Sequence, residues 1–160
     1  MRTKKIFFTV VFAAAILMFF GAGATNAKAE EGSVVYETVG FLYTSSMYDA
    51  QVILGLTADA IQNKIYEDDV TRQIIEEQVG LLSGMKDNAQ KLAAEFKAAG
   101  EDAAIMYEII SCIEKLEDTA ATLKQYIDEP TQENADLFQE KRALSYDSIK
   151  KLMEPVEESK

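Results

Sequence analysis

The chain lacks the residues on which most small helical enzymes and cofactor proteins depend. Its 160 residues include no histidine, no tryptophan and a single cysteine. Without histidine, a haem bundle loses its usual axial ligand and a di-iron bundle loses its Glu-x-x-His pairs. Zinc catalysis and serine or cysteine nucleophiles lose their usual ligand or general base. We therefore expect neither a cofactor nor an enzymatic activity.

The single cysteine cannot form a disulfide within the chain, so packing has to hold the fold. Cys112 lies inside the apolar run 109–113. We interpret it as a small buried hydrophobic residue. The alternative is a surface thiol that could link two copies of the chain.

Proline and glycine are scarce, and they stand where helices are expected to end. Neither strand-like alternation nor a hairpin turn signal interrupts the long segments. Gly100 is expected as a left-handed helix cap, Thr131 as an N-capping hydroxyl, and Pro130 as a helix stop. Apolar residues recur at helical spacing over four segments. The expected helices are 33–66, 69–99, 102–128 and 131–154.

Four amphipathic helices of similar length with short connections predict an all-α, antiparallel up-down four-helix bundle. The first joint, around residues 66–69, contains neither glycine nor proline. A bent continuous helix is therefore the alternative there. The expected apolar stripe of the second helix comprises Ile74, Leu81, Met85, Leu92 and Phe96.

Residues 1–29 have the three zones of a cleavable secretory signal peptide. Arg2, Lys4 and Lys5 precede an apolar run over 6–20, and the segment 27–29 is Ala-Lys-Ala. Small residues at these last positions fit a signal peptidase site. We expect cleavage after Ala29, a single domain over 30–160, and a periplasmic or secreted product. The alternative is an uncleaved anchor, the one case in which we expect membrane association.

Cleavage makes the product strongly acidic. All 27 acidic residues lie at or after Glu30, whereas four of the 16 basic residues lie before it. The mature chain holds 12 basic and 27 acidic residues, a formal net charge of −15. This field repels nucleic acid and favours cations or basic partners. We expect no nucleic-acid binding.

The first helix carries a polar insertion beside two tyrosines. Its polar residues are Thr44, Ser45, Ser46 and Asp49. A pocket between helices could use such groups with tyrosine hydroxyls. We therefore take Tyr43, Tyr48 and Asp49 as candidate contacts for a ligand or a partner.

A run of acidic residues at the first joint supplies the alternative site. Glu67, Asp68 and Asp69 are adjacent and could share a weakly bound cation at one end of a bundle. The spacing of a calcium-binding loop is missing. The more ordinary interpretation is a solvated helix start.

These observations favour an exported, non-catalytic binding protein of the cell envelope, acting on a partner protein or a small ligand. The alternative is an acidic cation-handling protein that binds metal through the 67–69 carboxylates. Gly80 and Gly84 have a spacing that permits close helix approach, so a homodimer is a further expectation.

The signal segment generates a first prediction. When the full chain is expressed in a bacterial host, intact mass measurement of the exported product should find a chain that begins at Glu30. Ala29→Arg should block this processing, because arginine does not fit the small peptidase subsite. Lys28→Gln, which alters the neighbouring position, should be processed normally. Export of a chain that retains residues 1–29 would contradict the prediction.

Overall fold

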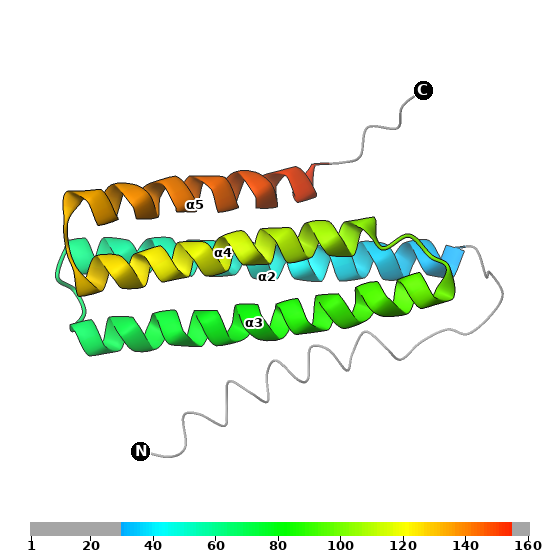
Figure 1. Cartoon of the computed structure of the whole chain (residues 1–160), viewed down its shortest axis with the longest axis horizontal. Helices are drawn as coiled ribbons and strands as arrows, with labels where there is room; N and C mark the ends of the chain where they lie inside the picture. The colour runs from blue at the N-terminus through cyan, green and yellow to red at the C-terminus, as the bar shows by residue number, and fades with distance from the viewer. Residues whose placement is uncertain (1–29, 155–160) are drawn as a thin grey trace, which may run out of the picture. The chain divides into compact units, whose positions relative to one another are not determined.

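The computed structural model describes residues 30–154, with side chains from residue 37 onward. These residues form four α-helices and no strand (Figure 1). The expected all-α class is confirmed for this range. The expected signal segment 1–29 and the tail 155–160 lie outside the described residues. The helices are α2 (Glu30–Gln62), α3 (Asp68–Ala99), α4 (Ala104–Asp128) and α5 (Gln132–Met153).

The chain divides into two units, Met1–Val35 and Tyr36–Lys160. Of the first unit, only the helical backbone at the start of α2 is described. Every contact reported below lies within the second unit. There, α4 packs against both α3 and α5, and consecutive helices run in opposite directions (Figure 1). This arrangement is consistent with the expected four-helix bundle.

None of the helices in the described range is both long enough and apolar enough to cross a membrane.

A true turn separates α2 from α3, so the alternative of one continuous helix is wrong. Helix α2 ends at Gln62, four residues before the expected end. Lys64 adopts a left-handed conformation with φ of 51°. Its N–H donates to the Ile61 carbonyl, and the N–H of Ile65 donates to the Ala60 carbonyl. This pair of hydrogen bonds satisfies the last carbonyls of a helix without glycine or proline.

The other two turns agree with the sequence analysis. Gly100 is the left-handed cap of α3, with φ of 76°. Thr131 caps α5, and its hydroxyl accepts a hydrogen bond from the Asn134 N–H at 3.2 Å. Short capped turns of this kind place successive helices side by side in antiparallel pairs.

Two apolar clusters form the core, and each draws on all four helices. The first includes Met47, Leu82, Met106 and Ile149, which are fully buried. The second is made of Leu54, Ala58, Ile75, Ala120, Leu123, Ile127 and Phe138. Burial of these side chains supplies the main drive to fold.

The buried stripe of α3 differs from the expected one. Its buried residues are Thr71, Ile75, Leu82, Ala89 and Ala93. Three of them, Ile75, Leu82 and Ala93, lie one position along from side chains predicted to be central. Leu81 is 46% exposed, and Leu92 and Phe96 cover the edge of the first cluster. Small residues at the centre let α3 approach its neighbours closely, and the larger ones fit at the flanks.

Three ion pairs join α3 to α4. Lys124 Nζ lies 3.8 Å from Glu76 Oε1, and the other two pairs are Arg72 with Asp128 and Lys86 with Glu117. Positions later in α3 pair with positions earlier in α4, so the pairs follow the antiparallel register. The Glu117 carboxylate, which accepts a hydrogen bond from Lys86, raises the pKa of that amine.

The turn after α2 generates a stability prediction. Lys64→Gly should stabilise the protein by about 1 kcal/mol, because glycine adopts positive φ without the steric cost of a side chain. Gly100→Ala is the matched opposite, since it places a side chain at positive φ and should destabilise by about 1 kcal/mol. Urea unfolding of the three proteins measures both changes. Loss of stability in Lys64→Gly would contradict the assigned turn.

Candidate functional site

A buried polar layer separates the two apolar clusters and joins three helices. Gln51 on α2 donates from Nε2 to the Arg142 carbonyl on α5 at 2.8 Å. The Ser145 hydroxyl donates to Gln51 Oε1 at 2.8 Å, and Thr119 Oγ1 on α4 lies 3.1 Å from Ser145 Oγ. The side chains of Gln51, Ser145 and Thr119 are all buried. A buried amide has to be satisfied by hydrogen bonds, so this layer fixes one register of α2 against α5.

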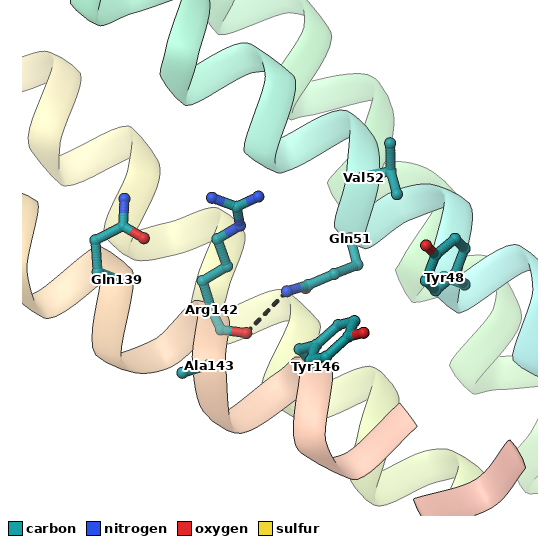
Figure 2. A pocket seen from close by; sticks show the side chains of 7 residues that line it. All are labelled: Tyr48, Gln51, Val52, Gln139, Arg142, Ala143 and Tyr146. Atoms are coloured by element: carbon teal, nitrogen blue, oxygen red, sulfur yellow. Dashed lines mark hydrogen bonds between the residues drawn. The ribbon is translucent and has the colours of Figure 1, made fainter. Parts of the chain in front are cut away.

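A groove of about 410 Å³ opens directly over this layer, between α2 and α5. Figure 2 shows Gln139 at one end, Tyr48 and Tyr146 at the other, and the Gln51–Arg142 hydrogen bond between them. Both tyrosine side chains remain exposed to solvent. The groove is lined by Tyr48, Gln51, Val52, Gln139, Arg142, Ala143 and Tyr146.

The guanidinium of Arg142 lies against the backbone of α2 at Gly55. A Cβ at position 55 would stand 2.2 Å from Arg142 Nη2, so only glycine leaves this space free. Figure 2 shows the side chain extending from α5 toward α2. Arg142 is half-buried, and within the described range its guanidinium has neither an ion pair nor a hydrogen bond. A partly desolvated cation of this kind is well suited to receive an anion.

An apolar stripe on α2 continues beyond the groove in both directions. We call it the α2 stripe, and it consists of Phe41, Tyr48, Val52 and Leu56, whose spacing of seven, four and four places them on one helix face. Phe41 is 72% exposed and Leu56 63% exposed. At 1.5 Å per residue the stripe is roughly 22 Å long. A row of exposed apolar side chains on one helix face, next to a groove, is a candidate interaction surface.

The structure separates the three residues expected to contact a ligand. Tyr48 lines the groove, whereas Tyr43 packs against the first core cluster and Asp49 is exposed outside the groove lining. Burial raises the pKa of the Tyr43 hydroxyl. Tyr48 therefore belongs to the site that the geometry forms, and the other two do not line it.

Glu67, Asp68 and Asp69 occupy the start of α3. Asp69 accepts a hydrogen bond from the N–H of Val70, and Arg72, in the first turns of the same helix, pairs with Asp128 of α4. Across the described ranges, no group of three or more acidic or cysteine side chains is arranged to hold a metal ion. The geometry gives the cation alternative no support, and it stays a prediction.

Two further sequence features have a structural place. Cys112 is buried in the first core cluster, and this burial raises the pKa of its thiol, so a surface disulfide is excluded for the folded chain. Gly80 and Gly84 lie on the exposed side of α3, and no atom of another described helix lies within 4 Å of a Cβ added at either. Close helix approach inside the fold is therefore not their role.

Comparison of the chain with protein-family models, with curated proteins and with solved structures found no significant match. The function therefore has to be argued from the geometry of this chain.

Sequence reasoning missed most of the groove residues. Ser145 falls on the apolar stripe of the fourth helix, and a hydroxyl at such a position is a signal for a buried hydrogen bond. Gly55, inside a long helix, is a second signal, since it costs about 1 kcal/mol against alanine there. Nothing in the sequence singles out Arg142, because its role depends on which helix faces α5.

The polar layer generates a stability prediction. Ser145→Ala should destabilise the protein by about 1–3 kcal/mol, because Gln51 Oε1 loses its donor in a buried position. Combining it with Gln51→Leu should cost less than the sum of the two single changes, since no unsatisfied amide remains. Ser148→Ala, one turn away and hydrogen-bonded at the surface, should change stability by less than about 0.5 kcal/mol. Urea unfolding measures the free energy of unfolding of each variant. Equal losses in Ser145→Ala and Ser148→Ala would contradict a stabilising role for the buried polar layer.

Proposed function

We propose that this chain is an exported, non-catalytic interaction protein that binds a partner protein through the α2–α5 groove and the α2 stripe. In this proposal the chain is cleaved after Ala29 and works in the periplasm or outside the cell as an antiparallel four-helix bundle. The observation that carries the proposal is the position of Arg142, a half-buried cation within a groove that continues into an exposed apolar stripe.

The residue types of this surface support binding to a protein. Tyrosine and arginine are enriched among the residues that contribute most to protein–protein affinity. Tyr48 and Tyr146 present large, rigid surfaces at a low cost in side-chain entropy. Gln51, at the base of the groove, is fixed in place by its hydrogen bonds to α5. Because the base of the groove is already ordered, less conformational entropy is lost when a partner binds.

The extent of the surface favours a protein over a small ligand. A volume of about 410 Å³ falls within the range of small-molecule sites, but such sites usually enclose most of the ligand. Here Tyr48 and Tyr146 face solvent, and the stripe reaches Phe41 and Leu56 at either side of the groove. A small ligand would leave most of that apolar surface in water. A protein segment would cover it.

Photo-crosslinking in the native cell envelope tests the proposal. A photoreactive amino acid replaces Val52 in one variant and Val79 in another. The two valines are matched, because the residues are 39% and 40% exposed, but Val79 lies on α3. We expect a discrete, higher-mass adduct from position 52, because the partner covers the α2 stripe.

Two results would overturn the proposal. One is the absence of any adduct from position 52 in cells that export the protein. The other is the same adducts from both positions, which would show non-specific collisions. As a further control, Tyr48→Ala combined with the probe at position 52 should reduce the adduct about tenfold or more, the usual effect of losing an aromatic anchor.

A further inference from the structure

We infer that the partner segment is an amphipathic helix whose apolar face carries a carboxylate that pairs with Arg142. This inference rests on the proposed function and specifies the chemistry of the partner at the same site. It makes the groove selective for one type of helix, since an apolar surface alone would accept any hydrophobic segment.

The charge around Arg142 points to a carboxylate from outside the fold. On α5, the residues one turn away in either direction are Phe138, Gln139, Ser145 and Tyr146, and none is acidic. The groove residues from α2 are uncharged as well, and Asp59, one turn beyond Gly55 on α2, forms no ion pair with Arg142. By contrast, Arg72, Lys86 and Lys124 all have acidic partners on the neighbouring helix. Most other basic side chains of the described range are exposed to solvent, whereas Arg142 is half-buried and has no carboxylate within ion-pair distance there.

The setting of the guanidinium would make such a pair strong. The guanidinium lies against α2 at Gly55, and a planar guanidinium binds a carboxylate through two parallel hydrogen bonds. Tyr48, Val52 and Tyr146 surround the position, and a docked helix would exclude water from it. Shielding from water strengthens the Coulombic attraction between the two charges, and the half-buried guanidinium has already lost part of its hydration.

The shape of the surface points to a helix. The α2 stripe presents apolar side chains over roughly 22 Å, about four helical turns, and α5 forms the second wall of the groove. Helices that dock in such grooves contribute apolar anchors every three or four residues, with polar contacts placed between them. The groove lies near the middle of the stripe, so the carboxylate is expected near the middle of the apolar face.

A second copy of this chain fits the surface less well. The mature protein has a formal net charge of −15, so two copies repel each other over their whole surfaces. From Tyr36 to Gln62, α2 itself carries three acidic residues and no basic residue. Two such helices placed face to face would add like-charge contacts. A separate partner with basic residues flanking its apolar face avoids this cost.

Selection from a displayed peptide library tests the inference even though the natural partner is unidentified. The library consists of amphipathic helices of about 18 residues in which one central position of the apolar face is fully randomised. The bait is the purified mature protein. We expect glutamate or aspartate to be enriched at the central position. Enrichment of neutral or basic residues there would overturn the inference.

Titration of a selected peptide measures the contribution of the carboxylate. Its glutamate form should bind about 10- to 100-fold more tightly than the matched glutamine form, as expected for a charge-assisted pair. Arg142→Gln should remove this preference. Gly55→Ala should reduce it, because the added Cβ displaces the guanidinium while its charge remains. Gly80→Ala, also a helical glycine but with open space around it, should leave binding unchanged.

The outcomes separate this inference from the proposed function. The proposed function itself would be overturned if the selected peptides bound the Val52→Asp variant with the same affinity as the native protein. It would also be overturned if the library yielded no binder. If the peptides lost affinity for Val52→Asp but bound Arg142→Gln as tightly as the native protein, only the inferred pairing of a carboxylate with Arg142 would be overturned. Analytical ultracentrifugation supplies a third result: a dimer that Val52→Asp dissociates would overturn the partner helix in favour of a second copy.

Discussion

The side chain of Gln51 ties α2 to α5, and the rest of the candidate site is arranged around it. Its amide bonds the Arg142 carbonyl and the Ser145 hydroxyl, both on α5. Because the amide is buried, sliding either helix by one position would leave polar atoms unsatisfied at a cost of about 1–3 kcal/mol each. This constraint fixes which residues of α2 and α5 face each other, and so brings the Arg142 guanidinium to Gly55.

Different interactions hold the two sides of the fold. Ion pairs join α3 to α4, and they use three basic residues with acidic partners on the facing helix. Neutral hydrogen bonds join α2 to α5. The α2–α5 side therefore retains a cation and an exposed apolar stripe, the features that a docking surface needs. The strong negative charge of the chain limits which partners can approach this surface.

Local signals predict the helices better than the site. Gly100 and Thr131 are recognisable as caps, because positive φ and N-capping are local properties of one or two residues. The end of α2 comes four residues earlier than expected, because Lys64 adopts a conformation that usually signals glycine. On α3, the largest apolar side chains are expected to be central, but close packing of helices favours Ala89 and Ala93 there. Of the residues expected to contact a ligand, Tyr48 lines the groove and Tyr43 supports the core.

The sequence by itself determined the all-α class, two of the helix caps and the excess of negative charge, since periodicity, capping and composition act over short stretches of chain. The absence of histidine likewise restricted the available chemistry before any fold was known. Only the tertiary structure decided that Gln51 meets Ser145 and that the Arg142 guanidinium lies on Gly55. These contacts join residues roughly 90 positions apart, and they depend on the helix register, which is set by packing and buried hydrogen bonds across the whole core.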